Sequence, residues 1–324
     1  MFDKSSFHVM IASDANYAEF VSVVIASIFD TNGPLFREIH IHLFSNGIPD
    51  DLIAKISLNI AEENGFLHVY DIGHIRDELN VSGNDTMPIS AYARLLLTKY
   101  VDDSISRILY VDCDTVFTDS IVELWNCNLG DNWIAGVLDA HMDSKPKTMI
   151  GMPEDAAYVN SGVLLINLDA WRENQIVEKF QRFIDSYNGL VYHQDQGIIN
   201  GVCNGHIMIL PPVYNAVSFF YSHPYKVLVK TNTPFYSRME MDDVRRAAKI
   251  IHFTEGYMGR PWMKHCKHPQ ASVFSKYHRM TAWKDVPLKK DNRSYPLQIC
   301  SWMFLNLPYS VFTAFMSILA RLKK

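Results

Sequence analysis

Short apolar runs alternate with longer segments of helical periodicity along roughly the first two-thirds of the chain. The short runs predict strands at residues 7–12, 39–44, 66–70, 108–111, 133–138 and 162–166. The longer segments predict helices at residues 17–29, 50–63, 91–100, 176–186 and 194–200. Strands that alternate with helices form a mainly parallel sheet covered by helices on both faces. The pattern therefore predicts an α/β fold.

The pattern changes after about residue 211, where prolines, aromatic residues and histidines accumulate. We expect loops and a small appended region there. With 324 residues, of which 48% are hydrophobic, the chain can bury the core of one large α/β domain and carry a smaller appendage.

Cysteine usage and the N-terminus both bear on the cellular compartment. The five cysteines are scattered and form no Cys-x-x-Cys pair, which favours a reducing compartment over a disulfide framework. Residues 1–6 lack the basic region and the apolar stretch of a secretory signal. We therefore expect a cytoplasmic protein.

The C-terminal part of the chain is basic, unlike the rest. Residues 260–324 contain twelve Lys and Arg and two acidic residues, a balance of +10; since the whole chain carries −5, the remainder carries −15. The end of this part predicts an amphipathic helix, with Val311, Phe312, Phe315, Ile318 and Leu319 opposite Asn306, Ser310, Thr313, Ser317, Arg321 and Lys324. Such a helix favours an anionic membrane surface, with packing on the protein's own core as the alternative. Nucleic acid is not expected, because the region is apolar as well as basic.

Two aspartates, Asp112 and Asp114, follow the apolar run at residues 108–111. Residues two apart on a strand point the same way, so both carboxylates can converge on one cation. Ligands of parallel sheets lie beyond the carboxyl ends of the strands. We therefore interpret the pair as a candidate metal site, with two solvated loop aspartates as the alternative.

No glycine-rich phosphate loop follows the first predicted strand, where Ala-Ser-Asp-Ala-Asn-Tyr occupies residues 12–17. A bound diphosphate must therefore be neutralised by a metal or by basic side chains.

Seven motifs occur in the order in which they are found in glycosyltransferase family 8, and the chain resembles its bacterial lipopolysaccharide galactosyl- and glucosyltransferases. They begin at residues 12, 91, 109, 129, 159, 193 and 252 and read ASDANY, AYARL, LYVDCD, LGDNW, VNSGVLLINL, HQDQGIIN and HFTEGYMGRPW.

The resemblance implies a catalytic domain of the GT-A type over residues 1–262, followed by the basic, amphipathic region over residues 263–324. It implies transfer of galactose or glucose from a UDP-sugar, with retention of configuration, to an oligosaccharide or glycolipid acceptor such as a lipopolysaccharide core. The enzyme would then work on the inner face of the bacterial cytoplasmic membrane.

The resemblance also assigns residues to the nucleotide and the metal. Asp112, Asp114 and His252 match the family's metal ligands, a set that suits Mn²⁺ and also admits Mg²⁺. The matched nucleotide-binding positions are Ala12, Asp14, Asn16, Tyr17, Asp112 and Arg260. Arg260 replaces the usual lysine at a longer interval from His252, and Lys264 is the alternative clamp for the diphosphate. The alternative interpretation of Asp14, from the sequence without the resemblance, is a helix N-cap.

The transferred sugar is assigned to Arg94, Asp139, Asn160, Asp195 and Gln196, of which Gln196, Asp195 and Asp139 match the catalytic positions. A carboxamide is a poor nucleophile, so we favour a front-face displacement in which the leaving diphosphate takes the acceptor proton. Asp195 as a covalent nucleophile is the alternative.

Two other classes of protein fit parts of the pattern. Asp-Cys-Asp-Thr-Val at residues 112–116 also matches the first motif of haloacid-dehalogenase-type phosphatases, with Asp112 as the nucleophile. The preceding predicted strands and the lack of a fitting later acidic motif argue against it. A sugar-nucleotide-binding protein without activity is disfavoured, because metal, base and sugar positions are all filled.

Overall fold

The computed structural model describes residues 6–79, 81, 89–140, 144–254 and 256–322. The expectation that residues 1–6 form no secretory signal therefore falls largely on residues outside the described part of the chain. The same holds for Lys324 and for the side chains of Ser317, Leu319 and Arg321 on the predicted amphipathic helix.

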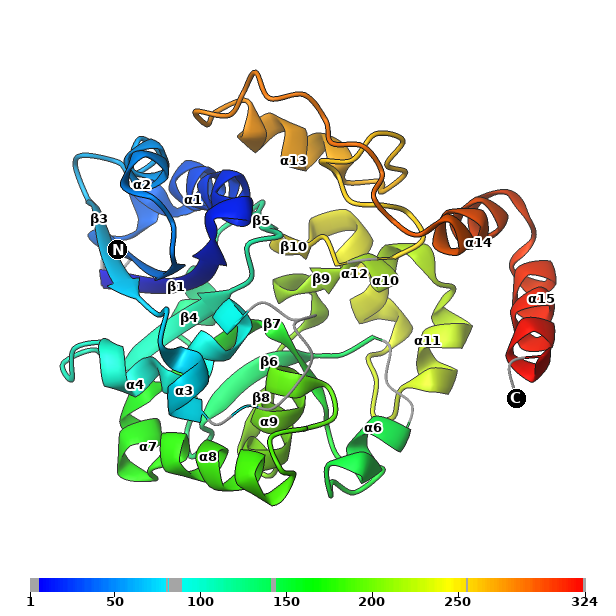
Figure 1. Ribbon diagram of the computed structural model, residues 1–324, viewed down its shortest axis with the longest axis horizontal. Helices are drawn as coiled ribbons and strands as arrows, with labels where there is room; N and C mark the ends of the chain where they lie inside the picture. Colours follow the sequence, from blue (N-terminus) through cyan, green and yellow to red (C-terminus); the bar gives the residue numbers. More distant parts are fainter. Residues whose placement is uncertain (1–5, 80, 82–88, 141–143, 255, 323–324) are drawn as a thin grey trace.

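A mixed sheet of seven strands lies at the centre of the molecule (Figure 1). In spatial order the strands are β3 (Gly65–Asp71), β2 (Glu38–Asn46), β1 (Ser6–Asp14), β4 (Arg107–Val111), β7 (Val159–Asn167), β6 (Ile134–Leu138) and β8 (Ile207–Ile209). Strands β3, β2, β1 and β4 are parallel, β7 is antiparallel to β4 and β6, and β8 is parallel to β6. The predicted α/β fold with a mainly parallel mixed sheet is confirmed.

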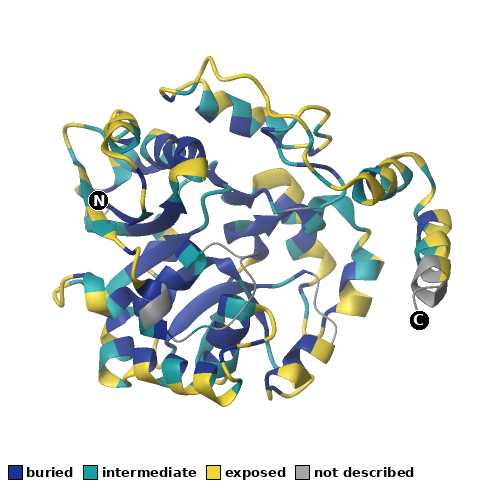
Figure 2. Ribbon diagram, viewed as in Figure 1, coloured by how far each residue is buried: buried dark blue, intermediate teal, exposed yellow. Residues whose placement is uncertain are grey.

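Helices cover both faces of this sheet, and burial decreases from the strands towards the outer sides of the helices (Figure 2). One hydrophobic cluster joins the sheet to α1 (Ala18–Asn32), α2 (Asp50–Ser57) and α5 (Val122–Trp125). The other cluster lies under α3 (Ile75–Leu79), α4 (Leu97–Tyr100), α7 (Leu168–Glu173), α8 (Ile176–Ser186) and α9 (Gln194–Cys203). Shorter segments are the 3₁₀ helices η1 (Ala15–Tyr17) and η2 (Gly33–Leu35), and α6 (Ser144–Met149).

The helix predicted at residues 91–100 begins as the 3₁₀ helix η3 (Ile89–Leu96) and becomes α-helical only in α4. Side chains three residues apart eclipse in a 3₁₀ helix. Ala91 and Arg94 therefore lie on one side of η3, and both line the same cavity.

Residues after 211 contain more regular structure than the sequence indicates. A second sheet has the order β5 (Thr115–Phe117), β10 (Ile250–His252) and β9 (Ala216–Val217). The helical elements of this part are η4 (Pro212–Tyr214), α10 (Ser218–Ser222), α11 (Tyr225–Thr231), α12 (Arg238–Ala247) and α13 (Ala271–His278). The strands here have two or three residues and most of the helices eight or fewer, which is too short to show a clear hydrophobic period, and the ten residues of α12 are mostly polar. The sequence therefore suggested loops.

The chain ends in two helices, α14 (Tyr295–Asn306) and α15 (Tyr309–Leu322), at the edge of the molecule (Figure 1). Before them, Trp262 packs against Phe20 of α1 and Phe274 of α13, with ring centroids 4.3 and 5.5 Å away. Within the described ranges no helix combines the length and the apolar character needed to cross a bilayer. The division of the chain at residue 262 remains a prediction.

Four histidines form a ladder across β1, β2 and β3. His8 and His42 approach to 3.1 Å between Nδ1 and Nε2, as do His40 and His68 to 3.0 Å. The rings of His8 and His40 stack at 4.6 Å, and those of His42 and His68 at 4.9 Å. Burial and the neighbouring histidines lower the pKa of His8 to about 4 and that of His42 to about 2. The ladder is therefore stable as neutral rings.

We expect the protein to lose stability as the pH falls below about 6.5, the pKa of an unfolded histidine. Because the unfolded chain binds these protons more readily than the folded one, each such proton lowers the free energy of unfolding by about 1.4 kcal/mol per pH unit. The loss continues down to the lowered pKa of the folded state. Urea unfolding at several pH values measures it. His42→Phe should flatten the profile between pH 6.5 and 4, and a profile as steep as that of the unmodified protein would contradict the assignment.

Candidate metal and donor-sugar site

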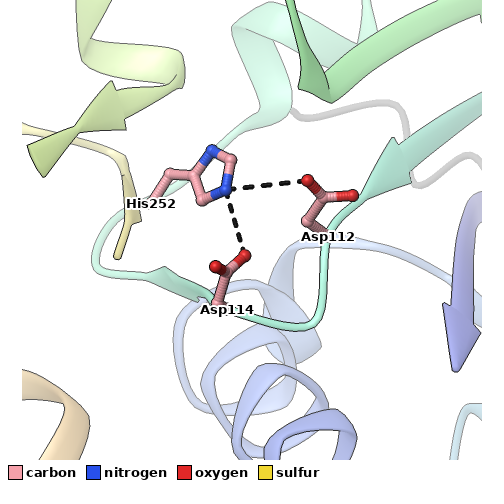
Figure 3. A group of neighbouring side chains, drawn as sticks. All are labelled: Asp112, Asp114 and His252. Atoms are coloured by element: carbon pink, nitrogen blue, oxygen red, sulfur yellow. Dashed lines mark ion pairs between the residues drawn. The ribbon is translucent and has the colours of Figure 1, made fainter. Parts of the chain in front are cut away.

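Asp112, Asp114 and His252 meet where the two sheets adjoin (Figure 3). Nε2 of His252 lies 3.6 Å from Oδ2 of Asp112 and 3.0 Å from Oδ1 of Asp114. Strands β5 and β10 are antiparallel with His252 opposite Thr115, and this register places the imidazole beside Asp114. Two carboxylates and one imidazole form a donor set that fits a divalent cation such as Mn²⁺.

The convergence of the two aspartates has a different local cause from the one inferred from the sequence. β4 ends at Val111 and β5 begins at Thr115, so Asp112 and Asp114 lie in a turn and not on a strand. The turn is closed because Thr115 donates to the Asp112 carbonyl from its amide at 3.2 Å and from its hydroxyl at 2.8 Å. Cys113, between the two aspartates, lines the same cavity as they do.

Asn215 orients the His252 ring. Nδ1 of His252 lies 3.0 Å from Oδ1 of Asn215, which favours the tautomer with the proton on Nδ1 and leaves Nε2 facing the carboxylates. Burial would lower the pKa of His252, but Asp114 and Asp112 outweigh it and raise that pKa. Burial would likewise raise the pKa of Asp114, which His252 and Arg260 instead lower. A proton and a cation therefore compete for Nε2, while Asp114 stays charged at neutral pH.

Gly162 on β7 leaves the space in which these side chains meet. A Cβ atom there would lie 2.2 Å from Cε1 of His252 and 2.6 Å from Oδ2 of Asp112. The Gly162 carbonyl also accepts from the Asp112 amide at 2.8 Å. Any side chain at this position would push the candidate ligands apart.

Arg94 is a buried cation between the candidate metal ligand Asp112 and Asp195. Its Nη2 donates to Oδ1 of Asp112 at 3.0 Å, and its Nε lies 3.4 Å from Oδ2 of Asp195. The guanidinium lies 3.8 Å from the centre of the Tyr110 ring, whose hydroxyl donates to Oδ1 of Asp112 at 2.6 Å. The side chain of Arg94 is 4% exposed, so its charge is balanced by these carboxylates and not by water.

Gln196 and Asp139 lie in one hydrogen-bond network. Nε2 of Gln196 donates to Oδ2 of Asp139 at 2.7 Å, and Oε1 of Gln196 accepts from the Ser161 amide at 3.1 Å. Asn160 donates to Oε1 of Gln196 at 3.3 Å and accepts from Asn215 at 2.9 Å. The network therefore runs from Asp139 and Gln196 to Asn215, the partner of His252.

Asp195 is buried at the start of α9, next to Gln196. The residue before this helix, His193, and its first residue, Gln194, have left-handed backbones with φ 59° and 51°. Oδ2 of Asp195 accepts from the Ser161 hydroxyl at 3.2 Å and faces Arg94. Burial raises the pKa of Asp195 although Arg94 and Ser161 favour its charged form. Because Ser161 and Arg94 already engage its Oδ2, the Asp195 carboxylate is poorly suited to act as a nucleophile.

Two adjoining cavities open on the candidate metal ligands. One, of about 220 Å³, is lined by Ala12, Ser13, Asp14, Tyr17, Ser90, Ala91, Arg94, Tyr110, Asp112, Cys113, Asp114 and Arg260. The other, of about 320 Å³, is lined by Arg94, Asp112, Asp114, Asn160, Ser161, Gly162, His193, Gln194, Asp195, Gln196, His252, Thr254 and Arg260. The first cavity contains every expected nucleotide-binding residue except Asn16, and the second contains every expected sugar-binding residue except Asp139.

Three sequence candidates, Asn16, Asp139 and Lys264, line neither cavity, whereas Arg260 lies between the two. Its Nη2 is 3.6 Å from Oδ2 of Asp114, and its Nη1 donates to the Tyr17 hydroxyl at 3.4 Å. Asn16 and Lys264 are exposed and line neither cavity. Asp14 caps η1 by accepting from the Asn16 amide at 2.9 Å and also lines the first cavity. Asp14 can therefore cap this helix and also face a nucleotide in the first cavity.

Several site residues were not found from the sequence. Asn215 follows a proline-rich stretch and carries no motif of its own; only the parallel pairing of β9 with β10 brings it beside His252. Ser161 and Gly162 lie in the motif that begins at residue 159, in which only Asn160 was assigned a role. Tyr110 was not distinguished from the rest of its predicted strand, because its neighbours are apolar.

The fold and the site define a glycosyltransferase of the GT-A type, a class supported by comparison with solved structures. The galactosyltransferase LgtC, solved with donor and acceptor sugar analogues, is similar with a TM-score of 0.70 at 26% identity, over 85% of this chain and 96% of that chain. The family model of glycosyl transferase family 8 matches residues 8–266. The chain belongs to this family.

Curated relatives agree with this assignment. The chain is 27% identical over 292 residues to the lipopolysaccharide 1,2-glucosyltransferase of Escherichia coli, covering 89% of this chain and 82% of that protein. It is 26% identical over 296 residues to General stress protein A of Bacillus subtilis, covering 86% of this chain and 95% of that protein. The comparisons give no support for the phosphatase alternative.

We expect Gly162→Ala to weaken divalent-cation binding roughly tenfold or more, because the new methyl group would displace His252 from Asp112. Titration of the purified protein with Mn²⁺, followed by calorimetry, measures the effect. Gly33→Ala is the matched control, since a Cβ there meets only Phe29 at 3.8 Å. An unchanged Mn²⁺ affinity in Gly162→Ala would show that the three side chains do not act together.

Proposed function

We propose that the protein is a retaining hexosyltransferase that moves galactose or glucose from a UDP-sugar to a cell-surface glycan such as a lipopolysaccharide core. The observation that carries this proposal is the position of Arg260. Its guanidinium lies between Tyr17 and Asp114, and hence between the cavity assigned to the nucleotide and the candidate metal ligands. A diphosphate that links a nucleoside to a sugar would have to lie there.

The first cavity supplies groups for uridine and the diphosphate. The Asp14 carboxylate can accept from the imide of uracil, and the Tyr17 ring offers a stacking face. Arg260 can bind phosphate oxygens with its planar fork. A Mn²⁺ or Mg²⁺ ion held by Asp112, Asp114 and His252 would offset negative charge on the departing diphosphate.

The second cavity supplies groups for the hexose. Asp195 lines this cavity and can accept from sugar hydroxyls, as can Asp139, which lies outside the lining and accepts from Gln196 at 2.7 Å. Asn160 and Gln196 can both donate and accept. The hydrogen bonds to Asp139 and Ser161 hold the Gln196 amide in one orientation. The resemblance to the family assigns the Gln196 oxygen to the place nearest the anomeric carbon.

We propose a front-face displacement at that carbon. The bond from the anomeric carbon to the β-phosphate oxygen breaks, and the acceptor oxygen bonds to the same face of the sugar. The acceptor proton passes to an oxygen of the leaving UDP, so the reaction needs no protein nucleophile. The contacts of Asp195 with Arg94 and Ser161 support this route over attack by its carboxylate.

We expect Asp114→Asn to abolish UDP release from UDP-galactose and UDP-glucose, because it removes a charged ligand that faces His252. Coupled UDP detection with Mn²⁺, with Mg²⁺ and with EDTA measures turnover, and NMR of the product reports the anomer. Asp50→Asn on the exposed side of α2 is the control. Full turnover in EDTA would contradict the metal assignment. Phosphate release from simple esters without UDP release would favour the phosphatase.

We also propose that the protein works in the cytoplasm, attached peripherally to an anionic membrane through α14 and α15. Apolar side chains that are exposed on these helices support this role: Tyr295, Ile299, Trp302, Leu305, Val311, Phe315 and Ile318. The charge of +10 over residues 260–324 would attract anionic lipid. Apolar area and basic charge together are typical of interfacial helices.

We expect the double variant Trp302→Ser and Phe315→Ser to lose most binding to phosphatidylglycerol vesicles and to keep UDP-sugar hydrolysis, because both side chains are exposed. Sedimentation with vesicles measures binding. High salt should weaken binding by the unmodified protein without abolishing it, since the aromatic contacts persist. The double variant Leu58→Ser and Met239→Ser, at exposed positions in other parts of the chain, is the control. Failure of the unmodified protein to bind these vesicles would refute the membrane role.

A further inference from the structure

The segment between His252 and Arg260 joins a candidate metal ligand to the candidate diphosphate clamp. Its start is held by α10, because the Ser218 amide donates to Oγ1 of Thr254 at 3.2 Å and the Ser218 hydroxyl donates to the Thr254 carbonyl at 2.9 Å. Thr254 lines the second cavity. Glu255 lies outside the described residues, and residues 256–259 form the rest of the segment, called here the donor loop.

Arg293 holds the donor loop from the C-terminal region. Its Nη1 donates to the carbonyls of Gly256 at 3.1 Å and Tyr257 at 3.4 Å, and to the Ser301 hydroxyl at 2.6 Å. Its Nε and Nη2 form a two-pronged ion pair with Asp291 at 2.9 and 2.6 Å. The Arg293 side chain is only 10% exposed. One guanidinium thus connects the donor loop, the segment before α14, and α14 itself.

The side chain of Tyr257 forms a second connection to the same helices. Its ring stacks on Phe304 of α14 at 4.8 Å and meets Phe312 of α15 edge-on at 5.2 Å. Phe304 and Phe312 also contact each other at 5.2 Å, and Phe312 is buried. The Ser301 hydroxyl donates to the Tyr257 carbonyl. Backbone and side chain of Tyr257 are therefore both fastened to the C-terminal helices.

The far end of the donor loop leads directly to Arg260. The Lys267 amide donates to the Met258 carbonyl at 2.7 Å, and Gly259 has a left-handed backbone with φ 73°. A Cβ atom on Gly259 would lie 3.7 Å from Nη2 of Arg293, so the loop passes close to the guanidinium. A shift of Gly256 and Tyr257 would move Arg260 away from Tyr17 and Asp114.

We propose that Arg293 is a positioning residue for the donor site, which holds the donor loop on α14 and thereby holds Arg260 between the two cavities. The proposal rests on the proposed function in so far as Arg260 binds a UDP-sugar diphosphate. It makes the inward-facing residues Ser301, Phe304 and Phe312 of the C-terminal helices a support for the donor loop. Donor binding without this connection would have to order the loop as well, at the expense of affinity.

Arg293→Ala should raise the KM for the UDP-sugar roughly tenfold to hundredfold, as expected for the loss of hydrogen bonds to a charged group, and should change kcat much less. Arg293→Lys should restore part of the affinity, since one ammonium can reach the carbonyls but cannot also form the fork to Asp291. Arg279→Ala, an exposed arginine at the end of α13, is the matched control and should keep the original KM.

Hydrogen exchange of the peptide over residues 253–262 tests the connection without any donor. Exchange there should be faster in Arg293→Ala and in the milder Ser301→Ala than in the Arg279→Ala control. Faster exchange together with an absence of UDP-sugar turnover by the unmodified chain would sink the proposed function and leave the connection standing. Unchanged exchange and unchanged KM in Arg293→Ala and Ser301→Ala would overturn the proposal. The proposal would also be overturned if Arg293→Ala lowered the thermal stability and reduced activity equally at all donor concentrations.

Discussion

The pairing of β5 with β10 is the constraint on which the site depends. In this antiparallel register His252 lies opposite Thr115, one residue beyond Asp114. Side chains alternate across a strand, so a slip by one residue would turn the imidazole to the opposite face and remove it from the carboxylates. The pairing also joins two parts of the chain that are separated by more than a hundred residues. The short second sheet therefore assembles the candidate metal centre, while the large sheet supports it.

Charge balance inside the protein connects the candidate metal ligand Asp112 to Asp195. Arg94 is buried and faces both Asp112 and Asp195, so neither carboxylate is buried without a cation beside it. Removing one member of such a group leaves a buried charge without compensation, which usually destabilises strongly. The same arrangement restrains Asp195 and keeps the Asp112 oxygens in place. The stability of the fold and the arrangement of the candidate site therefore depend on the same ion pairs.

The candidate site was predictable in part because some of its residues carry local patterns. Asp112 and Asp114 stood out because two carboxylates follow an apolar strand, and the ordered motifs drew attention to Gln196, Asp195 and Asn160. The strand argument for the aspartates was nevertheless wrong in detail, since a turn brings them together. Asn16 and Lys264, which the motifs or their spacing suggested, lie away from both cavities. Motifs identify residue types in order, but they do not specify the direction of each side chain.

By itself, the sequence determined the α/β class, the main strands and helices, the carboxylate pair and the family, because hydrophobic periodicity and short motifs are local properties of the chain. Only the tertiary structure decided that β7 lies antiparallel between β4 and β6, that Asn215 orients His252, and that Arg293 connects the donor loop to α14. These features depend on contacts between segments far apart in sequence. Strands of two or three residues and single hydrogen bonds leave no periodic pattern, so their partners are chosen by packing alone.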